Sequence, residues 1–216
     1  MQVSWMSSRF YLTCEWIWRF GYLHLLWLLF TLAGLIIFGL TPATVAVFAV
    51  VRKWRMKDAD ASVFTTFFHT YKKEFVKSNG IGLIMLIVAA VIIFNYFMIR
   101  TMPGLGADLL FVGNSLIAIF FVVVSLFIFP VYVHYQLSFL KLFRTALVIG
   151  LMNPHFVFLT LLIIAFVGYG FYLLPGLIPF FSSSVLAMCV MWFALNAFNH
   201  VEKKQRKWQE EESIGN

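Results

Sequence analysis

The feature that most constrains this chain is a series of apolar runs, each about 20 residues long. The first, GYLHLLWLLFTLAGLIIFGL from Gly21 to Leu40, contains one ionisable side chain, that of His24. A helix needs about 20 apolar residues to cross the roughly 30 Å hydrocarbon core of a bilayer. Because lipid offers no hydrogen-bond partners to a backbone, only helices and closed barrels cross it. The alternating pattern of barrel strands is absent, so the predicted fold class is an all-α, polytopic helical membrane protein.

The apolar runs predict about five transmembrane helices within a single membrane domain, residues 1–216. Composition agrees, because 62% of the residues are hydrophobic and 12% are charged, against about half and a quarter in soluble domains. The spans are predicted near residues 21–40, 81–99, 109–133, 156–174 and 177–198. Residues 1–20 are rich in aromatic side chains and are expected to form an interfacial N-terminal segment. Residues 199–216 are expected to form a cytoplasmic tail.

The positions of the basic residues predict the orientation. Thirteen of the sixteen Lys and Arg residues fall in the segments 52–80 and 130–155 and in the tail after Phe198. Cytoplasmic connections carry an excess of these residues, so these segments are expected inside the cell. Five spans in the plasma membrane then put the N-terminus outside and the C-terminus in the cytoplasm. The net charge of +7 follows from this bias, with attraction to anionic lipid as a second use, and no nucleic-acid partner is expected.

Residues 52–80 form a basic, amphipathic cytoplasmic segment. From Ser62 to Lys77 the apolar residues recur every three or four positions, which predicts a helix with one aromatic face and with Lys73 and Lys77 opposite. Ser62 is the predicted N-cap. The helix is expected to lie on the cytoplasmic surface, either as an anchor in the lipid interface or as a partner-docking surface. The residues assigned to that surface are Phe64, Phe67, Phe68, Tyr71, Lys72, Lys73, Phe75 and Lys77.

Five residues are predicted to kink or cap helices. Pro42 and Pro130 each lack a backbone donor and are expected to bend their helices, with Pro42 ending the first span. Asn79 and Gly80 are expected to stop the surface helix before the second span. Asn153 stands at the equivalent place before the fourth span. This order of proline, basic residues, phenylalanines and asparagine occurs twice and suggests a weak internal repeat.

Little in the sequence points to catalysis. The two cysteines, Cys14 and Cys189, are far apart, and none of the five histidines belongs to an HExxH motif. No catalytic, cofactor-binding or metal-ligating residue is therefore predicted, no cofactor is expected, and the protein is expected not to be an enzyme.

The polar residues inside the predicted spans are neutral. They are expected to serve close helix packing, and a neutral polar path for a transported molecule is the alternative interpretation. These residues are Asn95, Asn114, Ser115, Ser125, Ser182, Ser183, Ser184, Cys189 and Asn196. Two pairs of glycines, Gly34 with Gly39 and Gly168 with Gly170, are likewise expected to let helices approach closely.

One stretch, from Leu26 to Gly80, has a more specific pattern. An apolar span is followed by GLTPATVAVFAVVRKW and then by an amphipathic FTTFFHTYKKEFVKS before the next span. In these features the chain resembles the YesL-like family of bacterial integral membrane proteins, a domain of unknown function. Members of that family accompany carbohydrate ABC importers and polysaccharide-utilisation genes, chiefly in Gram-positive bacteria.

The resemblance implies a role in carbohydrate uptake or in its regulation. The expected function is that of a non-enzymatic accessory membrane protein, with the lipid bilayer and carbohydrate ABC transporter components as its partners. The alternative is a small transporter or permease subunit with a neutral polar path between helices. The segment FLKLFRTALVIGLMNPH lacks the Glu-Ala-Ala that docks the ATPase in ABC permeases, which counts against a conventional permease.

Overall fold

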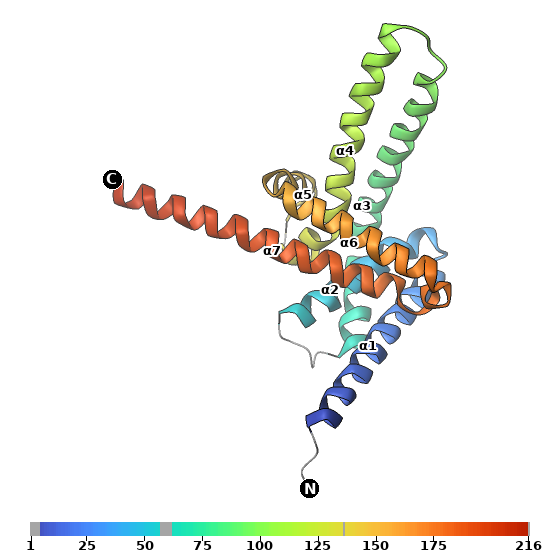
Figure 1. Cartoon of the computed structure of the whole chain (residues 1–216), viewed down its shortest axis with the longest axis vertical. Helices are drawn as coiled ribbons and strands as arrows, with labels where there is room; N and C mark the ends of the chain where they lie inside the picture. The colour runs from blue at the N-terminus through green and yellow to red at the C-terminus, as the bar shows by residue number, and fades with distance from the viewer. Residues whose placement is uncertain (1–4, 57–61, 136, 216) are drawn as a thin grey trace. The chain divides into compact units, whose positions relative to one another are not determined.

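A computed structural model of the chain describes residues 5–56, 62–135 and 137–215 (Figure 1). Every regular element in these ranges is helical, which confirms the predicted all-α class. The elements are α1 (Trp5–Ala33), α2 (Ile37–Arg55), α3 (Val63–Ile99), α4 (Leu105–His134), α5 (Phe139–Met152), α6 (Pro154–Leu173), the short 3-10 helix η1 (Pro175–Leu177) and α7 (Ile178–Gly215). Within the described residues six helices are long and apolar enough to cross a membrane: α1, α2, α3, α4, α6 and α7.

The predicted first span, residues 21–40, is wrong because the helix breaks inside it. α1 ends at Ala33 and α2 begins at Ile37. Between them, Leu35 and Ile36 have φ angles of 55° and 65°. Left-handed backbone is uncommon in any residue with a side chain, and it is an outlier in a β-branched one. One predicted span is therefore two helices, and residues before Gly21 belong to α1 rather than to a separate interfacial segment.

Two glycines make this sharp reversal possible. A Cβ on Gly34 would overlap the backbone of Gly39, and a Cβ on Gly39 would lie 2.7 Å from the carbonyl oxygen of Phe30. The predicted close approach at Gly34 and Gly39 is therefore confirmed. At Gly168 and Gly170 a Cβ would meet no described atom within 4 Å, so the second predicted pair does not form a close contact.

α1 and α2 form an antiparallel hairpin. Near the turn, Trp27 Nε1 donates to Thr44 Oγ1 at 3.1 Å. At the far end of α2 the ring of Trp54 packs edge-on against Trp16, with centroids 5.5 Å apart, and against Phe20. Because both ends of α2 contact α1, the chain returns along the path by which it came. α2 is therefore a candidate membrane helix in addition to the five predicted spans. From the sequence alone, most of its residues were expected to lie in the connection after the first span.

The predicted helix ends at Pro42 and at Asn79–Gly80 are wrong. α2 runs through Pro42, which is buried inside it. α3 continues through Asn79 and Gly80, and α4 contains Pro130 and ends four residues later. Local preferences of this kind amount to about 1–3 kcal/mol, and the long apolar flanks with their packing outweigh them. Asn153, by contrast, is the C-cap residue of α5.

The remaining predicted spans correspond to helices. Residues 81–99 are the second part of α3, residues 109–133 lie in α4, residues 156–174 in α6 and residues 177–198 in α7. α7 continues as one helix through most of the predicted tail. The chain is therefore built from longer helices than the sequence predicts.

The chain forms two compact units, which are described separately. Unit 1 comprises Met1–Phe75 and Leu162–Met191, and unit 2 comprises Val76–Leu161 and Trp192–Asn216. In unit 1 the buried residues gather along α2 and at the start of α3. In unit 2 the core joins residues of α3, α4, α5 and α7, namely Ile81, Phe127, Ile128, Val131, Leu142, Ala146, Ile149, Ala194, Ala197 and Phe198.

Candidate functional site

The first candidate is the basic beginning of α3, where the sequence predicts a docking or anchoring surface. The backbone N–H of Thr65 donates to Ser62 Oγ at 3.4 Å, so Ser62 is the N-cap that the sequence predicts. The helix then runs without a break to Ile99. The basic segment was predicted to be a separate helix. It is instead the first part of a helix that continues into an apolar span.

One face of this segment is fixed inside unit 1. Phe67 is 0% exposed, and its ring lies 5.3 Å from that of Phe30 in α1. The hydroxyl of Tyr71 donates to the carbonyl oxygen of Phe30 at 3.0 Å. Lys53 Nζ of α2 donates to Thr66 Oγ1 at 3.1 Å, and Thr66 is half-buried. These contacts hold α3 against the hairpin, and this face is structural.

The opposite face combines aromatic rings with lysines. Phe64 and Phe68 are 47% and 44% exposed, and their rings stack with centroids 5.8 Å apart and planes within 3°. Six residues line a hollow of about 600 Å³ on this side: Phe64, Thr65, Phe68, His69, Lys72 and Lys73. We call these six residues the exposed α3 face.

The prediction of a single aromatic face is therefore correct only in part. The aromatic stripe is about 100° wide on a helix of 3.6 residues per turn, and the edge of the buried surface runs through it. Phe67 and Tyr71 fall on the buried side, whereas Phe64 and Phe68 fall beside Lys72.

Two further residues assigned to the docking surface lie elsewhere. The ring of Phe75 packs edge-on against Tyr71 at 5.5 Å. Lys77 belongs to unit 2, where its Nζ donates to the carbonyl oxygen of Leu137 at 3.3 Å and lies 5.1 Å from the centre of the Tyr132 ring. Lys77 thus holds the connection between α4 and α5, and it is not among the residues of the exposed α3 face.

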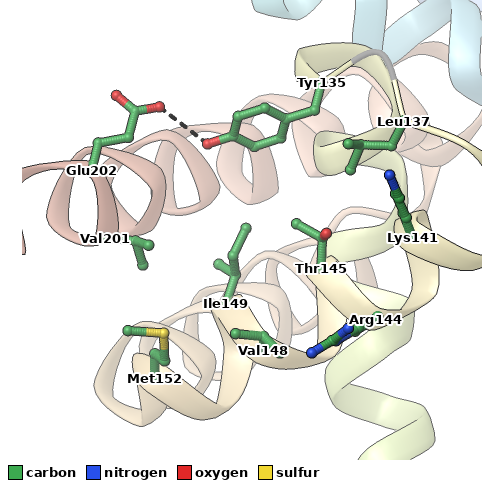
Figure 2. A pocket seen from close by; sticks show the side chains of 10 residues that line it. All are labelled: Tyr135, Leu137, Lys141, Arg144, Thr145, Val148, Ile149, Met152, Val201 and Glu202. Carbon is green, nitrogen blue, oxygen red and sulfur yellow. Dashed lines mark hydrogen bonds between the residues drawn. The ribbon is translucent and has the colours of Figure 1, made fainter. Parts of the chain in front are cut away.

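The second candidate is a pocket in unit 2 that the sequence analysis missed (Figure 2). It is a hollow of about 450 Å³ between the end of α4, α5 and α7. Its lining residues are Tyr135, Leu137, Lys141, Arg144, Thr145, Val148, Ile149, Met152, Val201 and Glu202. In the sequence, Lys141 and Arg144 contribute only to the predicted orientation. The amphipathic pattern of α5 was the one available signal of a surface here.

The polar groups of this pocket divide between two walls. On one side, the hydroxyl of Tyr135 donates to Glu202 Oε1 at 3.1 Å. Burial raises the pKa of Tyr135, and the charge and hydrogen bond of Glu202 raise it further, so the phenol stays protonated and remains a donor. On α5, Lys141 and Arg144 form no ion pair or hydrogen bond with any other side chain that the structure describes. The pocket therefore presents two cations that have no partner among the described residues.

The polar residues of the apolar helices act mainly within their own helices. Four of them donate to the carbonyl oxygen four residues earlier: Ser115, Ser125, Thr160 and Asn196. Others bond between helices. His24 Nδ1 lies 2.8 Å from Ser183 Oγ in unit 1, and Asn114 Nδ2 donates to the carbonyl oxygen of Ile92 at 3.3 Å in unit 2. These bonds support the expected packing role.

The cap residue Asn153 also joins two helices of unit 2. Its amide nitrogen donates to the carbonyl oxygen of Ile149 at 2.9 Å, and its Oδ1 lies 2.7 Å from His200 Nδ1 of α7. Among the described residues no group of three or more His, Cys, Asp or Glu side chains lies together as metal ligands would.

Long apolar helices, helix-to-helix polar bonds and amphipathic basic segments together define a polytopic helical membrane protein. Comparison with known proteins identifies the family of this chain. The family described as "Protein of unknown function, DUF624" matches residues 20–96, a range that contains the α1–α2 turn and the exposed α3 face. No solved structure matches the chain significantly.

Three curated proteins of Bacillus subtilis (strain 168), each described as an uncharacterized protein, are similar over most of their length. YesV is 36% identical over 94% of this chain and 97% of its own. YesL is 36% identical over 90% of this chain and 91% of its own, and YteU is 35% identical over 90% and 89%. The chain belongs to the YesL-like DUF624 family, which confirms the resemblance seen in the sequence.

Proposed function

We propose that this protein is a non-enzymatic accessory membrane protein that docks a component of a carbohydrate ABC importer on its exposed α3 face. The observation that carries the proposal is the stacked pair Phe64 and Phe68, half exposed beside lysines while the other face of the helix is fixed. Aromatic anchors are enriched among the residues that dominate protein–protein binding energy. The link to carbohydrate import rests on the gene neighbourhood of the family.

Docking suits this face better than anchoring. α3 has 37 residues and is therefore about 55 Å long, whereas the hydrocarbon core is about 30 Å thick. Its apolar residues 81–99 suffice to cross, so its first part extends beyond the hydrocarbon. An anchor would insert the aromatic side of the helix into lipid, but Phe67 and Tyr71 are already engaged within unit 1. The rings that remain stand next to cations.

The charge of the exposed α3 face indicates the kind of partner surface. Lys72 and Lys73 are exposed, with His69 beside them. Complementary charge guides association and favours the correct partner. We expect an acidic surface with an apolar centre on the importer component.

We also propose that both termini are cytoplasmic. The predicted external N-terminus required one crossing between residues 20 and 52. The antiparallel hairpin removes that basis, because it returns the chain to the side from which it came. Arg9 and Arg19 then lie on the same side as the basic segment after Trp54, and Arg100 is left as the one basic residue outside.

Cysteine labelling in intact cells tests this orientation after Cys14 and Cys189 are replaced by alanine. A cysteine at Gly104 should react with an impermeant maleimide, and cysteines at Tyr11 and Lys73 should react only after the membrane is permeabilised. Labelling of Tyr11→Cys from outside would restore the external N-terminus.

Co-purification tests the docking function. The protein, tagged and crosslinked in its native membrane, should recover a carbohydrate ABC importer subunit, identified by mass spectrometry. Lys72→Glu/Lys73→Glu should lower that recovery roughly tenfold, since two close charge pairs become repulsive. Lys203→Glu/Lys204→Glu is the matched control with the same change of charge, and it should recover the partner normally. Equal recovery by both variants, or no importer subunit with the wild type, would refute the proposal.

The alternative of a small transporter gains no specific support. The neutral polar side chains that would line a path mostly bond to their own helices, as Ser115 and Ser125 do. Sugar uptake by the purified protein alone in vesicles would favour the alternative over docking.

A further inference from the structure

We propose that the pocket beside α5 binds an anionic phospholipid of the phosphatidylglycerol type. Its phosphate would lie at Lys141 and Arg144, its headgroup hydroxyls at Glu202, and the start of an acyl chain along Val148 and Met152. This site belongs to unit 2 and is independent of the docking function proposed above.

The position of α5 in the chain favours lipid as the ligand. It joins α4 to α6, and both of these helices are long and apolar enough to cross a membrane. α5 therefore lies where the chain leaves the bilayer and enters it again. Its inner residues Leu142 and Ile149 are buried, whereas Leu140 is 82% exposed and Leu151 is 52% exposed. Exposed aliphatic residues beside Lys and Arg are typical of a helix in the membrane interface.

The pocket changes from polar to apolar along α5 (Figure 2). Lys141 and Arg144 stand on the first half of the helix, and Val148 and Met152 stand on the second half. Seven residues separate Lys141 from Val148, which is about 10 Å along a helix. A phospholipid has the same order of parts, since an anionic group is followed by hydrocarbon.

The charges select among headgroups. Lys141 and Arg144 lack protein partners among the described residues, and Glu202 contributes one negative charge, so these three groups sum to +1. Both cations are exposed, and basic side chains at a membrane surface attract anionic headgroups. Phosphatidylglycerol carries one negative charge and completes the balance, whereas phosphatidylethanolamine is neutral and brings an ammonium group toward two cations. Glu202, which already accepts a hydrogen bond from Tyr135, has a second oxygen for a headgroup hydroxyl.

The size and the open apolar end distinguish a lipid from a soluble phosphate. A volume of about 450 Å³ falls within the usual range of about 300–1,000 Å³ for small-ligand sites. It accommodates a headgroup but not two acyl chains. Inorganic phosphate would leave Val148, 41% exposed, and Met152 facing water, whereas a lipid chain would cover them. Basic pockets between membrane helices on the cytoplasmic side are a known mode of headgroup binding.

Native mass spectrometry of the full-length protein in detergent provides the test. The probes are dioleoyl phosphatidylglycerol, dioleoyl phosphatidylethanolamine and inorganic phosphate. The wild type should form a one-to-one adduct with phosphatidylglycerol in preference to phosphatidylethanolamine, and phosphate should not displace it. Lys141→Gln/Arg144→Gln should bind phosphatidylglycerol roughly 30-fold more weakly, because two cations at a membrane surface are lost.

Two further variants distinguish lipid binding in the pocket from a general effect of the protein's charge. Lys72→Gln/Lys73→Gln makes the same change of charge in unit 1 and should bind the lipid like the wild type. Val148→Trp leaves all charges in place but fills the apolar end, so it should weaken binding. Thermal unfolding without lipid checks that each variant is folded. Three results would overturn the proposal: unchanged lipid binding by Lys141→Gln/Arg144→Gln, equal binding of the two lipids, or displacement of the lipid by phosphate.

Discussion

The chain contains two basic amphipathic segments, one in each unit, and they differ in what they leave exposed. The beginning of α3 buries Phe67, packs the half-buried Tyr71 against Phe30, and exposes the stacked rings of Phe64 and Phe68 beside lysines. α5 buries the aliphatic residues Leu142, Ala146 and Ile149 and exposes Leu140, Val148 and Leu151 beside Lys141 and Arg144.

One sequence pattern therefore produces two kinds of surface. Both segments read as basic amphipathic helices, and in both the inner face is fixed by packing. The outer faces differ in chemistry, because flat rings suit a shaped protein surface whereas flexible aliphatic side chains suit lipid. The comparison therefore predicts that substitutions on the inner faces affect stability, and that substitutions on the outer faces affect binding.

The largest effect is expected for Phe67→Ala. The side chain is fully buried against Phe30, and truncation of a buried Phe costs about 3–5 kcal/mol. The free energy of unfolding, measured by denaturant titration in detergent, should fall by that amount. A loss below about 1 kcal/mol would show that the buried face of α3 is not fixed as described.

The second largest loss of stability is expected for Leu142→Ala in α5. Leu142 is 1% exposed, and Leu→Ala in a core costs about 2–5 kcal/mol. Leu140→Ala is the control on the outer face of the same helix, and it should change the free energy of unfolding by less than about 0.5 kcal/mol. Similar losses in both variants would contradict the division of α5 into two faces.

A smaller effect is expected for Lys77→Met. This change removes the bond from Nζ to the carbonyl oxygen of Leu137 and the contact with the ring of Tyr132. Because Lys77 is exposed, the loss should be about 1 kcal/mol, with faster hydrogen exchange in the connection after α4. Lys73→Met, which removes a lysine from the exposed α3 face, should leave both measurements unchanged. If the two variants behave alike, Lys77 does not hold that connection.

The smallest effect on stability is expected for Phe64→Ala and for Phe68→Ala. Each loses a stacked ring pair, and such pairs contribute about 0.5–1.5 kcal/mol; with both rings half exposed, the loss should lie at the lower end. The same variants should weaken recovery of the importer subunit. A stability loss as large as that of Phe67→Ala would mean that the outer rings are part of the core.

Much of the architecture was predictable because it depends on composition. Long apolar runs require helices in lipid, and α4 and α6 follow the predicted spans closely. The α1–α2 turn was not predictable in this way. It contains no polar turn residue, and its sharpness depends on Leu35 and Ile36 adopting a backbone that such residues rarely adopt. Gly34 and Gly39 were the one signal of close approach.

The candidate sites were less predictable, for two physical reasons. The exposed α3 face depends on where the buried edge crosses an aromatic stripe, and that edge is set by contacts with Phe30, a residue of another helix. The pocket beside α5 unites residues that are distant in sequence, since Tyr135 and Glu202 are 67 positions apart. Periodicity within one segment carries no information about such partners.

The turn between α1 and α2 pairs the backbone N–H groups at its tip. The N–H groups of Gly34, Leu35, Ile36 and Ile37 all donate to carbonyl oxygens within the turn or the last part of α1, at 2.7–3.1 Å. The side chains of Leu35 and Ile37 are 78% and 76% exposed. Leu35, Ile36 and Ile37 are all apolar. These four donors therefore need no water at the tip of the turn. A turn with paired donors and apolar side chains suits the apolar end of a membrane hairpin better than one that leaves such donors without partners.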